Sequence, residues 1–229
     1  MATTPVAVEA WRGGRVESRH RVRACVVDAA GGTVLAVGDV DEPVFPRSAV
    51  KPFQALALVE TGAADAFAVD DRELALACAS HGGEPEHVAL VEAWLARLGL
   101  DDAALACGPH PPMHGPAAAA LARSGVAPRR AHNNCSGKHA GMLAVALHLG
   151  APTRGYERPD HPVQRHVARA LAELAGLATL PEPGIDGCGL PNFPIPLRGL
   201  ARAAAALVAP AGLVPERERA LARIAAAMR

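Results

Sequence analysis

Strand-like sequence is concentrated near the N-terminus of this chain, and helix-like sequence fills most of the rest. Two β-prone runs, RVRACVVDA at 21–29 and TVLAVGD at 33–39, flank AGG and predict a β-hairpin. A lone hairpin is marginal as a sheet, so we expect further strands, from this chain or from another one. After Pro196 the sequence is Ala-rich and helix-like up to Arg229, without a helix stop. These features predict an α+β fold whose C-terminal sheet strands are missing.

The helical region begins with SAVKPFQALALVETG, residues 48–62, which has apolar residues at helical spacing. Ser48 is placed to act as the N-cap, Pro52 falls in the first turn, and Gly62 is placed to end the helix. Helical patterns also occupy 70–80, 84–99, 115–125, 136–150, 161–176, 198–209 and 215–229. Half of the 229 residues are apolar, so we expect one domain, residues 1–229, around a sizeable core.

Composition excludes several classes of function. The formal charge is zero and no basic block occurs, so nucleic-acid binding is not expected. The N-terminus lacks a basic segment followed by an apolar run, and no stretch approaches the roughly 18 apolar residues of a membrane helix. Five cysteines without close pairing indicate reduced thiols. We therefore expect a cytoplasmic protein.

Lysine occurs only at Lys51 and Lys138, although the chain has 23 lysines and arginines together. A chain that uses arginine almost everywhere else indicates a specific chemical demand at these two positions. Arginine stays charged, so it can neither accept a proton nor bind a metal as a neutral amine can.

In SAVK, Ser48 and Lys51 are three residues apart, which places them on one face of a helix. A neutral lysine amine can activate a serine hydroxyl as a nucleophile. Its pKa must then be lowered by burial or by a neighbouring cation such as Arg47. The pattern S-x-x-K is a signature of serine β-lactamases and penicillin-binding proteins. The alternative is an N-cap serine followed by a surface lysine.

A second serine, Ser80, ends a helix-like run in CASHGG, before the glycine pair at 82–83. Glycines let backbone amides approach a ligand closely, so this loop could bind a carboxylate or an oxyanion. The alternative is an ordinary helix end with glycines as its cap.

HNNCSGKHAG, residues 132–141, is the densest polar cluster and opens a helix. Cys135 and His139 are four residues apart, which permits metal binding or a thiol activated by imidazole. GIDGCGLPNFPIP, residues 184–196, adds Asp186 and Cys188 in a Gly-rich loop. Zinc is a weak inference from this spacing, and a buried apolar role is favoured for Cys25, Cys78 and Cys107.

Together, RSAVKPFQ, ACASHGGEPEH, HNNCSGKHAGML and GIDGCGLPNFPIPL resemble, in this order, the bacterial asparaginase II family of thermolabile or class 3 asparaginases. The resemblance runs from about Val22 to the end of the chain. It implies hydrolysis of L-asparagine to L-aspartate and ammonia on a serine-β-lactamase-like fold, in a homodimer.

The resemblance also implies a role for individual residues. Ser48 would be the nucleophile, Lys51 its base and Ser80 an assisting serine. Zinc, in a supporting role in substrate binding, would be held by Cys135, Lys138 and Cys188. The residues expected at the substrate are Asp186, His139, Arg47, Gly82 and Asn134.

Members of this family are longer, and their additional part carries further sheet strands and a second active-site lysine. This chain has no lysine after Lys138, so we expect it to be C-terminally incomplete. Two alternatives to an active asparaginase follow. One is a truncated, non-catalytic member that keeps zinc or amino-acid binding, and the other is a β-lactamase-like acyl-enzyme hydrolase with a different substrate.

Overall fold

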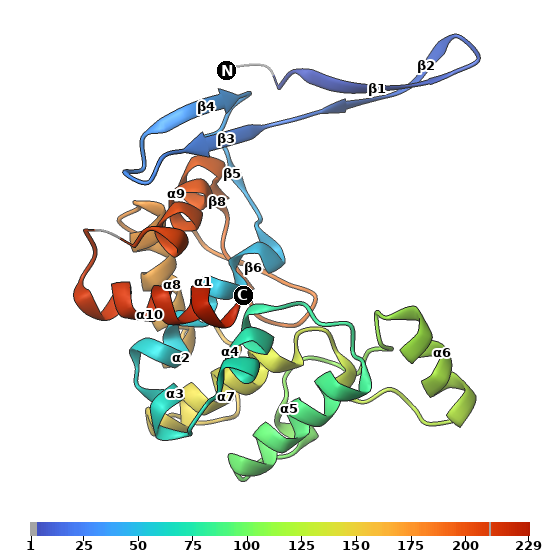
Figure 1. Cartoon of the computed structure of the whole chain (residues 1–229), viewed down its shortest axis with the longest axis vertical. Coiled ribbons are helices and arrows are strands. Elements are labelled where there is room, and N and C mark those ends of the chain that lie inside the picture. The colour runs from blue at the N-terminus through green and yellow to red at the C-terminus, as the bar shows by residue number, and fades with distance from the viewer. Residues whose placement is uncertain (1–3, 211) are drawn as a thin grey trace.

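The computed structural model describes residues 4–210 and 212–229 and has an N-terminal strand region followed by a body of helices (Figure 1). This mixture confirms the α+β class. The more specific serine-β-lactamase-like arrangement stays a prediction. The strands are β1 (Val6–Arg12), β2 (Arg15–Arg21), β3 (Ala24–Val27), β4 (Thr33–Val37), β5 (Pro43–Val44), β6 (Gly184–Ile185), β7 (Pro191–Asn192) and β8 (Ile195–Pro196).

The strands form four antiparallel pairs within the described residues: β1–β2, β3–β4, β5–β8 and β6–β7. The β3–β4 pair is the predicted hairpin, with Cys25 opposite Ala36. The β1–β2 pair was not predicted and extends from the body as an arm (Figure 1). Its turn is Gly13–Gly14, both at positive φ, as a tight hairpin requires. In the described part of the chain, no further strand joins β3–β4, and α9 packs against β3 instead.

The seven predicted helices after residue 70 are all present. They are α4 (Asp71–Cys78), α5 (Pro85–Arg97), α6 (Gly115–Ser124), α7 (Ser136–His148), α8 (Pro162–Ala175), α9 (Leu197–Val208) and α10 (Pro215–Ala227). A short α3 (Ala63–Ala66) and the 3₁₀ helices η2 (Asp102–Ala104) and η3 (Arg130–His132) were not predicted. None of the described helices is long and apolar enough to cross a membrane.

The single helix predicted over 48–62 is wrong in detail. The segment is divided into η1 (Arg47–Val50), α1 (Lys51–Gln54) and α2 (Leu56–Glu60). Ser48 lies inside η1 and is not an N-cap, because Pro46 precedes that helix without a capping side chain. Pro52 does lie in the first turn of α1, and Gly62, at φ +85°, follows the end of α2 as predicted.

Helix α7 lies at the centre of the helical body and packs against α2, α3, α4, α5 and α8. Residues 136–146 are all buried. A Cβ atom at Gly137 would lie 2.6 Å from Leu76 Cγ and 2.8 Å from the Leu76 carbonyl oxygen. Glycine therefore lets the start of α7 approach the end of α4, which brings the two polar motifs of these helices together.

A buried ion pair joins α10 to α2. Arg217 donates to Glu60 from Nε at 2.6 Å and from Nη2 at 3.1 Å, and the two side chains are 7% and 8% exposed. His166 of α8 also contacts Glu60, at 2.8 Å. Burial alone would raise the pKa of Glu60, but hydrogen bonds from His166 and Arg217 hold it below its usual value. The pair therefore fixes the C-terminal helix to the core.

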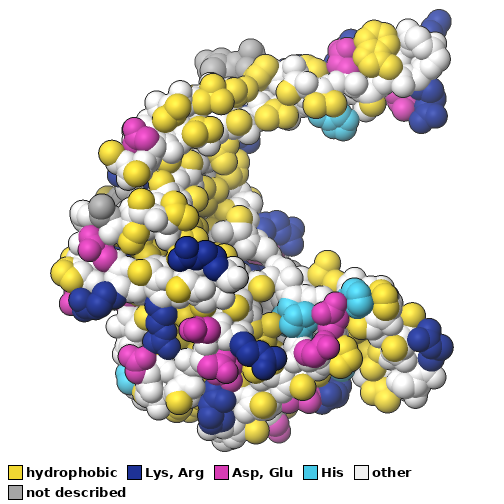
Figure 2. All heavy atoms as spheres, viewed as in Figure 1, with side chains coloured by type: hydrophobic (Ala, Val, Ile, Leu, Met, Phe, Trp, Pro, Cys, Tyr) yellow, Lys and Arg dark blue, Asp and Glu magenta, His cyan; other side chains and the backbone are white. Residues whose placement is uncertain are grey.

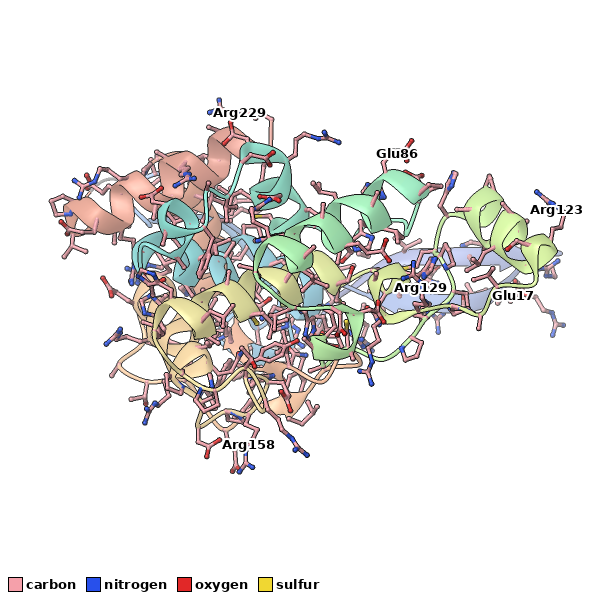
Figure 3. The ribbon with its side chains drawn as sticks, turned by 90° about the horizontal axis from the view of Figure 1, so that it is seen from below. Glu17, Glu86, Arg123, Arg129, Arg158 and Arg229 are labelled. Atoms are coloured by element: carbon pink, nitrogen blue, oxygen red, sulfur yellow. The ribbon has the colours of Figure 1, made fainter. Side chains whose placement is uncertain are left out.

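Exposed apolar side chains are not evenly distributed over the surface. Figure 2 shows apolar side chains gathered along the β3–β4 hairpin and over the helices below it. Val26, Val34 and Leu35 of this hairpin are each about half exposed or more. Figure 3 shows Glu17 of β2 and Arg123 of α6 extending toward the same side of the molecule.

Candidate active site

Lys51 begins α1 and is almost completely buried, with 1% of the residue exposed. Its Nζ atom donates to the Ala79 carbonyl oxygen at 2.9 Å and contacts Ser80 Oγ at 2.5 Å. Burial is the largest cause that lowers its pKa, and the nearby Lys138 adds to the effect. The thiols of Cys135 and Cys188 act in the opposite direction but do not reverse it. The site therefore favours a neutral amine more than water does.

Ser48 lies one turn before Lys51, and its carbonyl oxygen accepts the Lys51 backbone N–H. Its side chain is exposed. The preceding residue, Arg47, has φ +51°, which is unusual for a residue with a Cβ atom. Arg47 is held by an ion pair to Asp186 at 3.0 Å and by its backbone N–H bond to Asn192 Oδ1. The strained backbone beside Ser48 is therefore fixed by the later loop, as is common at functional sites.

Ser80 follows α4 in an extended segment and is exposed, directly above the buried amine of Lys51. Its neighbour His81 is 4% exposed. His81 Nδ1 accepts the Gly83 N–H at 3.1 Å, so the ring proton lies on Nε2 and is donated to Ser136 Oγ at 2.9 Å. Burial, with smaller effects of His87 and Lys51, lowers the pKa of His81 to about 4. A neutral imidazole therefore ties the Ser80 loop to α7.

An open cleft of about 550 Å³ reaches Ser80 from the solvent. His81 and Gly82 of the Ser80 loop line it, and Leu76 and Leu90 give it apolar walls. Charged side chains at the cleft come from Arg72 of α4 and Glu86 of α5, and Figure 3 shows Glu86 at the surface. The cleft offers a small polar substrate a route to the Ser80 hydroxyl.

The predicted metal ligands also lie together. Cys135 is the N-cap residue of α7, Lys138 lies in its first turn, and Cys188 is in the loop between β6 and β7. The three residues are 5–6% exposed, and Lys138 Nζ lies 3.3 Å from Cys188 Sγ. A hydrogen bond between the two thiols raises the pKa of Cys135 and lowers that of Cys188. Of the two thiols, Cys188 is therefore the one whose pKa the cluster lowers.

This donor set fits zinc chemically. Two sulfurs and one neutral amine are three N and S donors, and they leave a fourth position open. Within residues 4–210 and 212–229, no group of three or more His, Cys, Asp or Glu side chains is arranged to hold a metal. A zinc site at this cluster would therefore include the Lys138 amine, and the assignment of zinc stays a prediction.

The remaining predicted residues are spread around this cluster. Asp186 pairs with Arg47, and Asn134 is half-buried with its Nδ2 atom 3.1 Å from Met113 Sδ. His139 is completely buried, so it does not line the open cleft, and burial lowers its pKa. The assignment of these residues to substrate binding stays a prediction.

Two residues of the site were missed, His81 and Tyr156. The Tyr156 hydroxyl lies 2.5 Å from His139 Nδ1. Tyr156 is the single tyrosine of the chain, so the rarity that marked the two lysines also marked it. His81 carried no such signal, because it is one of ten histidines.

The fold and the site define a mixed α+β protein in which a buried lysine amine contacts a serine hydroxyl, next to a buried cluster of two thiols and a second amine. The chain belongs to the L-asparaginase II family, whose sequence model matches residues 8–229. The match confirms the resemblance and extends it to the β1–β2 arm. Family membership implies an amidohydrolase with a small-molecule substrate. A search of curated proteins found no match.

Proposed function

We propose that this protein hydrolyses the side-chain amide of L-asparagine to L-aspartate and ammonia, with Ser48 as the nucleophile and Lys51 as its base. The observation that carries the proposal is the contact between the buried Lys51 amine and the Ser80 hydroxyl at 2.5 Å. A surface lysine beside a helix cap, the alternative reading of SAVK, would be solvated and would make no such contact.

Lys51 can exchange protons in this environment. A neutral amine has two N–H groups and one lone pair. One N–H is occupied by the Ala79 carbonyl oxygen, and the lone pair is then available to a serine hydroxyl. Ser80, in contact with the amine, would pass a proton between Lys51 and a leaving group in the cleft.

In the proposed reaction, Ser48 Oγ transfers its proton to Lys51 and bonds to the side-chain amide carbon of asparagine. The C–N bond breaks, and the nitrogen takes a proton from Lys51 through Ser80 and leaves as ammonia. A water molecule then gives a proton to Lys51 and attacks the acyl-enzyme ester. The ester C–O bond breaks, Ser48 regains its proton from Lys51, and aspartate is released.

Cys135, Lys138 and Cys188 would hold zinc in the same proposal. When bound, zinc supplies a positive charge that attracts the substrate carboxylate and disfavours protonation of nearby amines. Coordination requires the neutral amine of Lys138. Homodimerisation and a cytoplasmic location, both expected from the sequence, stay predictions that sedimentation and fractionation would test.

The experiment is ammonia release from L-asparagine by the purified chain and by Ser48→Ala, Ser80→Ala and Ser124→Ala. We expect loss of turnover in Ser48→Ala and a fall of about 10²–10⁴-fold in Ser80→Ala, the usual range for a lost proton-transfer group. Ser124→Ala is the control, because its exposed hydroxyl bonds only at the end of α6, donating to the Leu121 carbonyl oxygen and accepting the Val126 backbone N–H. It should retain full activity.

Labelling with a diazo-ketone analogue of asparagine, followed by peptide mapping, identifies the nucleophile. We expect the label on Ser48. A label on Ser80 or Cys135 with Ser48 unmodified would refute the assignment. Hydrolysis of a β-lactam without ammonia release from asparagine would establish the acyl-enzyme alternative, and zinc binding without any turnover would establish the non-catalytic one.

A further inference from the structure

Asn192 of β7 is buried, with 9% of the residue exposed, and its side chain reaches the start of η1. The Oδ1 atom accepts the Arg47 backbone N–H at 3.2 Å. A backbone N–H can only donate, so the oxygen of the Asn192 amide, and not its nitrogen, faces Arg47. The two residues are 145 positions apart in the sequence. This bond therefore joins two distant segments directly before Ser48.

Arg47 is the joint that determines where Ser48 lies. The ring of Pro46 restricts its own φ, which is −75°, and the Pro46 carbonyl oxygen accepts the Ala49 N–H at 3.1 Å. Inside this turn Arg47 has φ +51°, a left-handed conformation that residues with a Cβ atom avoid. Without a partner for its N–H, Arg47 would relax toward negative φ. The chain that carries Ser48 would then rotate away from its present position.

The segment that carries Asn192 holds the Arg47 segment at other points as well. Val44 of β5 pairs with Ile195 of β8. The Arg47 guanidinium pairs with Asp186 at 3.0 Å, but the Arg47 side chain is 70% exposed, so solvent weakens this ion pair. The bond from Asn192 differs from both contacts, because it acts on the Arg47 backbone itself. Asn192 is consequently the side chain that holds the unusual φ.

We propose that Asn192 is a positioning residue for Ser48: its side-chain oxygen holds Arg47 in the left-handed conformation that keeps the Ser48 hydroxyl in place for attack. Asn192 acts through the Arg47 backbone and not on the reacting atoms. Attack requires the reacting atoms to lie about 3–3.5 Å apart and aligned, so a displaced hydroxyl slows the reaction without changing how the substrate binds. The inference rests on the proposed function, in which Ser48 is the nucleophile.

The first test is amide hydrogen exchange of the full chain, followed by NMR, and it needs no turnover. The Arg47 amide should be protected in the wild-type protein although the residue is exposed, because Asn192 accepts its proton. Asn192→Leu should lose this protection, and Asn192→Asp, which keeps an acceptor oxygen, should retain it. An unprotected amide in the wild type, or equal protection in the leucine variant, would overturn the proposal. If Asn192→Leu does not fold, the exchange in the wild type decides.

The second test is steady-state ammonia release from L-asparagine, with kcat corrected for the folded fraction measured by circular dichroism. Asn192→Leu should lower kcat by about 10²-fold, the effect of a displacement of about 1 Å, and should leave KM unchanged. Asn192→Asp should retain most of the turnover. His161→Leu is the matched control, since it removes another buried side-chain acceptor of a backbone N–H at 3.2 Å, that of Val163. Its kcat should not change.

Arg47→Gly tests the route through the backbone. Glycine adopts positive φ without a steric penalty, so Asn192→Leu should lose less turnover in this background than in the wild type. Equal losses in the two backgrounds, or a higher KM in place of a lower kcat, would overturn positioning through Arg47. Absence of ammonia release by the wild-type chain would refute the proposed function and the catalytic role of Asn192 with it, whereas the exchange result would still decide the contact with Arg47.

Discussion

Replacing Lys51 by methionine keeps the length of the side chain and removes the amine that contacts Ala79 and Ser80. If this amine is the base, turnover should fall by about 10²–10⁴-fold, equivalent to about 3–5 kcal/mol of transition-state stabilisation. Stability should change little at pH 7. The Ala79 carbonyl loses a partner, at about 1–3 kcal/mol, but a buried amine no longer has to lose its hydration.

The difference in stability between the wild-type protein and Lys51→Met should depend on pH. Burial lowers the pKa of Lys51 in the folded chain, whereas the unfolded value is about 10.4. Between these two values the unfolded chain binds more protons, so the stability of the wild-type protein rises with pH relative to that of the methionine variant. Urea unfolding from pH 7 to pH 10 measures this difference. Ammonia release measures turnover of the same samples.

A large loss of stability in Lys51→Met would contradict the assignment of Lys51 as a neutral base. If Lys51→Met lowers the free energy of unfolding by about 3–5 kcal/mol at pH 7, the amine is a charged partner of the thiols and not a neutral base. Lys51→Arg gives the comparison, because it retains a positive charge but accepts no proton. We expect it to lose turnover equally and to be less stable than the methionine variant, since it buries a permanent charge.

Three further outcomes follow from the packing. Arg217→Met should lower the free energy of unfolding at pH 7 by about 3–5 kcal/mol, because it removes the guanidinium and leaves the buried Glu60 carboxylate with His166 as its remaining partner. A loss below about 1 kcal/mol in urea would contradict this. Gly137→Ala should cost about 1–3 kcal/mol because its Cβ would meet a leucine carbonyl oxygen of α4 at 2.8 Å, whereas the control Gly115→Ala, with open space around its Cβ, should cost nothing. Between about pH 6.5 and about pH 4 the unfolded chain protonates His81 while the folded protein keeps it neutral, so the wild-type protein loses stability as the pH falls. His81→Gln should lose less stability over this range. If the free energy of unfolding of both proteins changes equally with pH, the buried imidazole is not held neutral.

Most of the helical architecture could be predicted from apolar spacing, because that spacing determines which face of a helix is buried. The segment 48–62 could not, since its division into three short helices depends on tertiary contacts. The φ of Arg47, held by Asp186 and Asn192, is one of these contacts. The β1–β2 arm was missed although the glycine pair at 13–14 is a typical hairpin signal.

For the site, rare residue types were the informative feature. The two lysines belong to one cluster, because Lys138 lies close enough to Lys51 to lower its pKa. The sequence could not reveal that Ser80, rather than Ser48, contacts the amine, because this depends on how closely α4 approaches α1. Nor could it reveal that the buried His81 imidazole contacts Ser136, which depends on how α4 and α7 pack together.

The β3–β4 hairpin has a consequence for handling the protein. Each of its strands is bonded on one side only within the described residues, so the opposite flanks offer free backbone donors and acceptors beside exposed Val26, Val34 and Leu35. An extended chain from another molecule can continue such a ladder. At high protein concentration, molecules should therefore associate through these strand edges before the helical body unfolds. Val34→Lys should reduce this association, measured as a smaller particle size by light scattering.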